Sequence, residues 1–350
     1  MSGGVDSSVA ACLMQEAGFA CAGATMRLTC PEEEPDASSR TCCSHRDVED
    51  AAAVAARLSM PFFVWSYTQE FEEDVIRKFV AEYEAGRTPN PCVDCNRTMK
   101  FGRFLTRALA EGYDVIATGH YARITKAADG TYELRRAKDL SKDQSYVLAM
   151  LTQAQLAHIR FPLGEFSKEE ARAMAEARGL ITARKHDSQD ICFVPDGDYA
   201  RFLEEYTGKT YAPGEFRDPE GKVLGTHRGA VRYTLGQRKG LGLALPAPGY
   251  VYAKDMKENI VYVGPEEKVF SLRCTVSDVN YISGIVPDAP FRAEVVTRYR
   301  KTPQPAAVTP LPDGRAEIVF DAPQRAVTPG QLAVFYEDDR VLGGGIIDAP

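Results

Sequence analysis

The amino-acid sequence predicts an α/β domain with a doubly wound parallel sheet, followed by a β-rich central domain and a C-terminal β-barrel. Three observations lead to this prediction. The 350 residues exceed the usual size of one domain. Helical patterns alternate with short apolar runs up to about residue 185, and short strands separated by glycine and proline follow after about residue 208. We place the domains at residues 1–207, 208–277 and 278–350.

Helices and strands are expected to alternate through the first domain. Apolar residues recur every three to four positions in the helical segments, and the strand candidates are short apolar runs. The last of these helices begins with a Ser-Lys-Glu-Glu capping box. The expected helices are 7–16, 47–58, 71–83, 101–111 and 167–178, and the expected strands are 20–26, 62–65 and 114–118.

Short β-rich runs predict strands in the second half of the chain. The prolines between residues 287 and 312 fit turns and strand edges, because proline cannot donate a ladder hydrogen bond. The expected strands are 231–234, 260–263, 291–299 and 316–320.

Composition narrows the class of protein. The sequence contains no run of 18 or more apolar residues, so we expect no membrane span. We also expect no export signal at the N-terminus. We therefore expect a cytoplasmic protein with no membrane partner. The nine cysteines then suggest thiol or metal chemistry in a reducing compartment and not a disulfide framework. Cys12, Cys21 and Cys274 lie in apolar patterns and are expected in the core.

The distribution of charge favours a polyanion-binding surface. The net charge of −7 argues against a uniformly basic nucleic-acid binder, yet residues 221–254 contain six basic residues and no Asp or Glu. An ordinary solvated surface is the alternative. A second basic cluster comprises Arg298, Arg300 and Lys301. The first segment contains Lys222, Arg228, Arg232, Arg238, Lys239 and Lys254.

The first motif, Ser-Gly-Gly-Val-Asp-Ser-Ser at residues 2–8, opens a predicted helix. Its glycines let the backbone approach an anion, and a helix start offers N–H groups and a positive dipole end. The hydroxyls add donors, and Asp6 could hold a magnesium ion that bridges phosphates. A glycine turn that only caps the helix is the alternative. The motif lacks the Gly-Lys-Ser/Thr of a Walker loop, which disfavours γ-phosphoryl transfer.

Three further cysteines stand in polar segments. Cys92 and Cys95 form a Cys-x-x-Cys after two prolines, which we expect to stiffen a loop. The pair could be half of a zinc site, a redox pair or neither, and the sequence offers no second ligand pair with matching spacing. Cys192 could be a reactive thiol or a buried structural one.

An ordered set of motifs resembles one family across essentially the whole chain. The opening loop is similar to the PP-loop of the ATP pyrophosphatases, which cleave ATP between the α and β phosphates and adenylate a substrate. Together, the motifs resemble the bacterial tRNA-specific 2-thiouridylases, the MnmA/TrmU family. These motifs are residues 2–8, 88–96, 100–101, 117–121, 142–146, 187–193, 234–242, 328–331 and 343–347.

The resemblance implies that sulfur replaces O2 of the wobble uridine in the tRNAs for Glu, Gln and Lys. ATP, with Mg²⁺, would adenylate O2, and AMP would leave when sulfur attacks. Cys192 would carry a persulfide received from a sulfur donor, a cysteine desulfurase or a relay protein. Cys95 would release the sulfur by forming a disulfide. The residues implied in ATP binding are Ser2, Gly3, Gly4, Asp6, Ser7, Ser8, Met26 and Gly119.

The same resemblance implies a tRNA-binding surface. Phosphate contacts would position the tRNA, while the flipped wobble base would be read in the ATP pocket. The residues implied in tRNA binding are Lys142, Gln144, Arg238, Lys239, Arg298 and Arg300.

Position 92 varies within the family, because some members have Asp where this chain has Cys. Cys92, Cys95 and Cys192 could therefore hold a [4Fe–4S] cluster whose open iron binds the sulfur to be transferred. This cluster mechanism is the alternative to the persulfide relay.

Two other functions fit parts of this sequence, and one strand that the family normally has is absent from it. The chain could be another adenylating enzyme, such as an amidotransferase, or a tRNA-binding protein without catalysis. In the family a short apolar strand, usually central in such a sheet, precedes the Ser-Gly-Gly, whereas here Met1 directly precedes Ser2. We expect that strand to be missing, through a misplaced start codon or a truncation that leaves an inactive tRNA-binding form.

Overall fold

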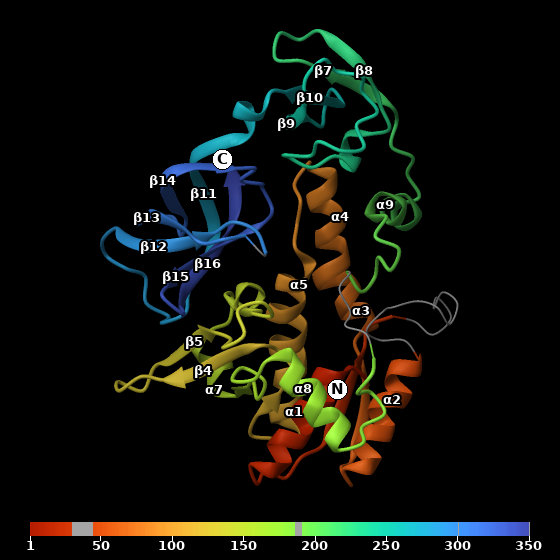
Figure 1. The fold of residues 1–350 in the computed structure, drawn as a ribbon, viewed down its shortest axis with the longest axis vertical. Helices are drawn as coiled ribbons and strands as arrows, with labels where there is room; N and C mark the ends of the chain where they lie inside the picture. The colour runs from red at the N-terminus through yellow and green to blue at the C-terminus, as the bar shows by residue number, and fades with distance from the viewer. Residues whose placement is uncertain (30–44, 186–190, 300, 350) are drawn as a thin grey trace.

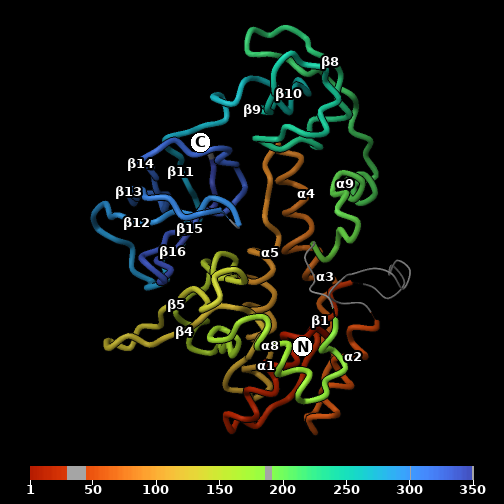
Figure 2. Tube along the Cα trace, in the orientation of Figure 1, coloured from red at the N-terminus to blue at the C-terminus, as the bar shows by residue number. Residues whose placement is uncertain are grey.

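The computed structural model describes residues 1–29, 45–185, 191–299 and 301–349, which form three domains (Figure 1). The N-terminal domain lies at the bottom of this view, the central sheet at the top and the C-terminal barrel to the left. The tube in Figure 2 shows the same arrangement. Within these ranges, no helix is both long enough and apolar enough to cross a membrane.

Parallel strand pairs form the centre of the N-terminal domain, as predicted. β1 pairs with β2 and β3 pairs with β6, both in parallel. The helices α1, α2 and α8 share one apolar cluster that includes Val9, Cys12, Val54 and Ala171. The elements are α1 (Val5–Glu16), β1 (Gly23–Arg27), α2 (His45–Arg57), β2 (Phe62–Ser66), β3 (Ile116–Ala117), β6 (Ile159–Arg160) and α8 (Lys168–Ala177).

Two long helical runs follow β2, and both contain a π-helical stretch. The first is α3 (Thr68–Phe71), η2 (Glu72–Ile76) and α4 (Arg77–Glu84). The second is α5 (Pro91–Asp94), η3 (Cys95–Phe104) and α6 (Leu105–Ala110). Single π-helical turns inside helices are frequent at functional sites.

The second run begins ten residues before the predicted helix 101–111, so the predicted loop at Cys92 and Cys95 is wrong. Pro91 occupies the first helical position, where its fixed φ and missing N–H are tolerated. The Asn90 side chain caps the helix and accepts a hydrogen bond from the Cys92 N–H at 3.2 Å. Both thiols therefore project from the first turns of a helix.

The central domain is a four-stranded sheet in the order β8-β7-β10-β9. The predicted strand 231–234 is wrong, because this segment contains the short helix η5 (Ala230–Arg232). Gly229 and Gly236 have φ of 101° and 83°, so the chain turns at both ends of the segment. The strands are β7 (Gly214–Arg217), β8 (Val223–His227), β9 (Tyr250–Asp255) and β10 (Ile260–Gly264). α9 (Tyr199–Thr207) precedes this domain, and η6 (Glu266–Val269) follows its sheet.

Six antiparallel strands close into the C-terminal barrel. Their order is β11-β14-β13-β12-β15-β16, and β11 pairs with β16 to complete the ring. Cys274 is buried in its core, as expected, whereas Cys21, just before β1, is only partly buried. The strands are β11 (Phe270–Tyr281), β12 (Phe291–Val296), β13 (Gln304–Pro310), β14 (Ala316–Arg325), β15 (Leu332–Glu337) and β16 (Arg340–Ala349).

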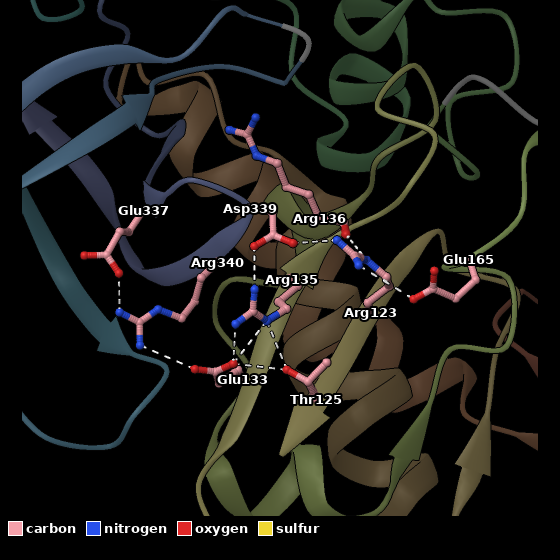
Figure 3. Close-up of polar contacts among 9 residues, drawn as sticks. All are labelled: Arg123, Thr125, Glu133, Arg135, Arg136, Glu165, Glu337, Asp339 and Arg340. Carbon is pink, nitrogen blue, oxygen red and sulfur yellow. Dashed lines mark hydrogen bonds and ion pairs between the residues drawn. The ribbon is translucent and has the colours of Figure 1, made fainter. Parts of the chain in front are cut away.

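A hairpin of the N-terminal domain joins the barrel through an ionic network (Figure 3). Asp339, in the turn between β15 and β16, accepts hydrogen bonds from Arg123 and Arg135 at 2.6 Å each. The Arg136 N–H donates to the Asp339 carbonyl at 2.7 Å, and Arg135 pairs with Arg340 in the sheet. The hairpin strands are β4 (Ala122–Lys126) and β5 (Tyr132–Arg136); η4 (Ser145–Leu148) and α7 (Gln153–Ala157) follow.

Candidate active site

The opening loop forms a tight turn at the start of α1. Gly4 is the N-cap residue and supplies no side-chain cap to the first turn. The Ser7 and Ser8 hydroxyls both donate to the Gly4 carbonyl, at 3.2 and 2.8 Å, and the Ser2 N–H donates to Ser7 Oγ at 3.1 Å. Ser8 is fully buried and also accepts from the Thr182 hydroxyl at 3.0 Å. The Ser8 hydroxyl therefore shapes the loop from inside.

Two glycines allow neighbouring backbone to approach this loop closely. Gly3 has φ of 66°, and a Cβ there would lie 2.2 Å from the Asp47 carbonyl oxygen. A Cβ on Gly119 would lie 2.6 Å from the backbone carbon of Asp6. Gly119 follows β3 and Met26 is the penultimate residue of β1, so these two predicted ATP residues lie at the carboxyl ends of parallel strands, and Gly119 lies against the opening loop. Open α/β sheets bind ligands at that edge.

Asp6 is held by two residues that the sequence did not single out for this role. Lys168 Nζ donates to both carboxylate oxygens of Asp6, at 2.7 and 2.8 Å, and the Tyr121 hydroxyl donates to one at 2.9 Å. Lys168 is 8% exposed, and 162 positions separate it from Asp6. Both carboxylate oxygens of Asp6 are therefore engaged by described side chains at the start of α1.

Lys185 ties the segment before Cys192 to the opening loop. Its Nζ donates to the Gly3 carbonyl at 3.0 Å and to Asp50 at 2.7 Å, and it also contacts Asp47 on α2. Burial lowers the pKa of Lys185, but the hydrogen bonds to both carboxylates outweigh it and raise the pKa overall. The motif residues 186–190 lie outside the described ranges.

Cys95 and Cys192 belong to one apolar cluster. Cys95 is 9% exposed at the start of η3, and the partly buried Cys192 packs against the same group of buried side chains. Phe193 contacts Phe71 and Phe79 edge-on, at ring distances of 5.8 and 5.1 Å, which anchors the segment of Cys192. Met26 packs on this cluster too, so the thiols and the end of β1 share one core.

The structure does not support the alternative [4Fe–4S] site. Cys92 is exposed, whereas Cys95 is buried one helical turn later. Across the ranges that the structure describes, no three His, Cys, Asp or Glu side chains gather as ligands of a metal ion. The six described cysteines, Cys92, Cys95 and Cys192 among them, form no disulfide with one another either.

The barrel holds the segment before the thiols in place. The Thr88 N–H donates to the Pro329 carbonyl at 2.8 Å, and Gln331 Nε2 donates to the Thr88 carbonyl at 2.6 Å. Gly330 has φ of 88°, and a Cβ there would lie 2.9 Å from the Thr88 nitrogen. The Thr-Pro-Gly-Gln motif of the barrel therefore fixes the backbone that leads into α5.

Two of the implied tRNA-binding segments lie side by side. The Tyr299 hydroxyl donates to the Asp143 carbonyl at 3.3 Å, which brings Arg298 next to Lys142–Gln144. Gln144 Oε1 accepts from the Tyr121 N–H at 3.0 Å, so this side chain also braces the residue that holds Asp6. Arg300 lies outside the described ranges.

The basic segment 221–254 is only partly available to a polyanion. Arg238 and Lys239 are exposed and form no ion pair with a described residue. Arg232 pairs with Glu204 at 2.8 Å, and Lys254 Nζ points inward to the Tyr233 carbonyl at 2.7 Å. Lys301, in the second cluster, likewise donates to the Arg325 carbonyl. The prediction that segment 221–254 forms one polyanion-binding surface is therefore wrong for Arg232 and Lys254.

The burial of Lys254 has a measurable consequence. Burial lowers the pKa of Lys254 from 10.5 to about 8. Between these two pH values the unfolded chain therefore binds more protons than the folded one. The free energy of unfolding consequently rises with pH across this range. We expect Lys254→Met to raise the free energy of unfolding near neutral pH by at most about 3 kcal/mol. That advantage should shrink by about 1.4 kcal/mol per pH unit above pH 8. Urea unfolding of both proteins at about pH 7 and pH 9.5 measures it, and a pH-independent difference would contradict the assignment.

With the opening loop at the start of α1, the N-terminal domain is a nucleotide-binding α/β domain of the HUP class. Two β domains follow it in this chain. The family model of the tRNA methyl transferase HUP domain matches residues 1–196. The tRNA methyl transferase PRC-barrel domain matches residues 200–265, and the aminomethyltransferase beta-barrel domain matches residues 271–347.

Relatives match over nearly the full chain. A protein of Heliobacterium modesticaldum is 50% identical over 99% of this chain and 91% of its own length. Proteins of Acetivibrio thermocellus and Magnetococcus marinus are 49% and 47% identical, each over 99% of this chain and 97% of their own length. All three are described as tRNA-specific 2-thiouridylase MnmA. The chain belongs to this family of tRNA sulfurtransferases.

Proposed function

We propose that the chain catalyses ATP-dependent 2-thiolation of the wobble uridine in the tRNAs for Glu, Gln and Lys. The observation that carries this proposal is that Cys95, Cys192 and Met26 share one apolar cluster, while the Thr25 hydroxyl of β1 donates to the carbonyl of Met1, next to the opening loop, at 2.6 Å. A second thiol at that place has no use in an amidotransferase.

The first step would activate the uridine. Its O2 attacks the α-phosphate of ATP, pyrophosphate leaves, and the oxygen becomes part of a good leaving group. The backbone N–H groups at the start of α1 would bind the phosphates, with Gly3 and Gly4 allowing close approach. Mg²⁺, held by Asp6 and the phosphates, would offset their charge.

The second step would transfer sulfur. The terminal sulfur of a Cys192 persulfide attacks C2, and AMP leaves with the former O2. The Cys95 thiolate then attacks Sγ of Cys192, which releases 2-thiouridine and leaves a Cys95–Cys192 disulfide. A thiol reductant restores both thiols, and a persulfide donor protein recharges Cys192. The apolar surroundings of both thiols would limit hydrolysis of the persulfide and of the adenylate.

The test of this proposal is tRNA-dependent cleavage of ATP. The full chain is incubated with ATP, Mg²⁺, a persulfide donor and unmodified tRNA for Glu, with a tRNA carrying a wobble cytidine as the control. We expect AMP, pyrophosphate and 2-thiouridine in equal amounts with the first tRNA alone. Absence of tRNA-dependent AMP would contradict the proposal and favour a binding protein. AMP without thiouridine would favour another adenylating enzyme.

Arg238 and Lys239 are proposed to contact tRNA phosphates, because both are exposed between glycines on the segment that packs against the barrel. Charge reversal of both residues to Glu should weaken tRNA binding at least about tenfold. It should also reduce the slope of log affinity against log salt by about two. Filter binding at several salt concentrations measures this.

The matched control carries the same charge change elsewhere. Arg292→Glu with Arg315→Glu alters two exposed arginines of the barrel that pair with Asp321 and Asp313. We expect that control to retain a larger salt slope. Equal slopes in both double variants would refute a specific role of Arg238 and Lys239.

A further inference from the structure

We propose that Arg136 binds a phosphate group of the tRNA, an inference that rests on the function proposed above. Arg136 is the last residue of β5, and Arg135 precedes it in the ionic network with Asp339. Side chains alternate along a strand, so neighbouring positions face opposite sides. Figure 3 shows the Arg136 guanidinium directed away from the network that its neighbours form.

The surroundings of Arg136 differ from those of the nearby arginines. Arg123, Arg135 and Arg340 each form an ion pair with a carboxylate. Among the described residues, Arg136 forms no such pair; its side chain hydrogen-bonds with the Tyr336 hydroxyl, while its buried Nε has no hydrogen-bond acceptor. A buried guanidinium N–H without an acceptor is costly in a finished structure, which points to a partner that binds later.

The Arg136 guanidinium lies over an aromatic ring. Its central carbon lies 3.9 Å from the centroid of the buried Tyr336 ring. Stacking of this kind fixes the orientation of a guanidinium and leaves its N–H edge for a bidentate acceptor. Phosphate is the acceptor that such a fork binds best in RNA.

Hydrogen bonds connect this arginine to the implied tRNA-binding segments. The Tyr336 hydroxyl lies 3.1 Å from Ser145 Oγ, which donates to Asp143 at 2.7 Å. Tyr299 donates to the Asp143 carbonyl from the other side. Burial raises the pKa of Asp143, and the charge of Arg136 acts against that rise. A chain of contacts through Tyr336, Ser145 and Asp143 therefore connects Arg136 with Lys142–Gln144 and Arg298.

The Asp143 carboxylate, which interacts electrostatically with Arg136, forms its hydrogen bonds with other groups. Asp143 already accepts from the Ala137 N–H at 2.9 Å and from the N–H and hydroxyl of Ser145 at 3.2 and 2.7 Å. These bonds turn its oxygens to the backbone of its own loop. An external phosphate would supply the acceptor that Arg136 Nε lacks, and under the proposed function tRNA is the phosphate-bearing ligand that binds near Lys142–Gln144 and Arg298.

The experiment compares Arg136→Gln and Arg136→Lys with the parent chain in tRNA binding at several salt concentrations. We expect Arg136→Gln to bind tRNA about tenfold more weakly and to lose about one unit of the salt slope. Arg136→Lys should keep the slope, because it keeps the charge, while losing part of the affinity. Arg292→Gln on the outer face of β12 is the control and should bind like the parent.

Thermal unfolding and ATP binding without tRNA are measured on the same variants. Unchanged tRNA affinity and slope in Arg136→Gln would overturn the proposal. The proposal would also be overturned if Arg136→Gln and Arg136→Lys lost tRNA affinity equally and in proportion to a lowered unfolding temperature. That pattern would indicate that Arg136 acts only by packing against Tyr336. If the parent chain itself shows no salt-dependent tRNA binding, the proposed function is contradicted. This result differs from the two outcomes above, in which the parent chain binds tRNA.

Discussion

Gly3→Ala is expected to abolish ATP binding and to destabilise the N-terminal domain. The added Cβ would lie 2.2 Å from the Asp47 carbonyl oxygen, and φ at this position is 66°. The left-handed backbone alone costs about 1–2 kcal/mol for a residue with a side chain, and the overlap adds about 1–3 kcal/mol. The shift would also move the carbonyl that Lys185 contacts. Calorimetry of unfolding and equilibrium binding of an ATP analogue measure the two effects.

Gly4→Ala is the matched control at the adjacent position. Among the described residues, a Cβ there would meet only Ser2 Oγ, at 3.7 Å, and the backbone of Gly4 has φ of −99°. We expect its unfolding temperature to stay near that of the parent, while ATP binding weakens because the methyl group occupies the approach of the phosphates. If Gly3→Ala left both stability and ATP binding unchanged, the geometry of this loop would be wrong.

Cys192→Ser should reduce 2-thiouridine formation by at least about 10³-fold, as loss of a nucleophile does in other enzymes. Pyrophosphate release in a single turnover should persist, because adenylation does not use the thiol. Cys95→Ser should stall one step later and accumulate a tRNA linked to Cys192 through a disulfide. Denaturing gels with and without dithiothreitol, together with nucleoside mass spectrometry, separate these outcomes.

Cys92→Ser decides between the relay and the cluster. Cys92 is exposed and belongs to no group of metal ligands in the described part of the chain, so we expect nearly full thiolation from a persulfide donor. A loss as severe as that of Cys192→Ser, together with iron bound by the parent chain, would reverse the conclusion.

Local patterns predicted much of the fold. The glycines and serines of residues 2–8 indicated an anion-binding loop at a helix start, and α1 begins at Val5. The capping box at Ser167 marked the start of α8, where both reciprocal hydrogen bonds form. Such signals lie within a few residues of one another, so a single sequence contains them.

Other features depend on contacts that no local pattern encodes. The ion pair of Lys168 with Asp6 spans 162 positions, and the bond of Gln331 to Thr88 spans 243. The β4–β5 hairpin was missed because its strands are polar and its place is set by the barrel turn at Asp339. The helix start at Pro91 was mistaken for a loop, although Asn-Pro is also a common cap and first residue of a helix.

The most direct measurement follows one sulfur atom. The chain is loaded with ³⁵S persulfide at Cys192, freed of the donor, and mixed with ATP, Mg²⁺ and unmodified tRNA for Glu in a single turnover. We predict that label appears in 2-thiouridine at the wobble position, only when ATP is present, with one AMP formed for each labelled nucleoside. Label that stays on the protein, or that reaches the tRNA equally without ATP, would contradict it.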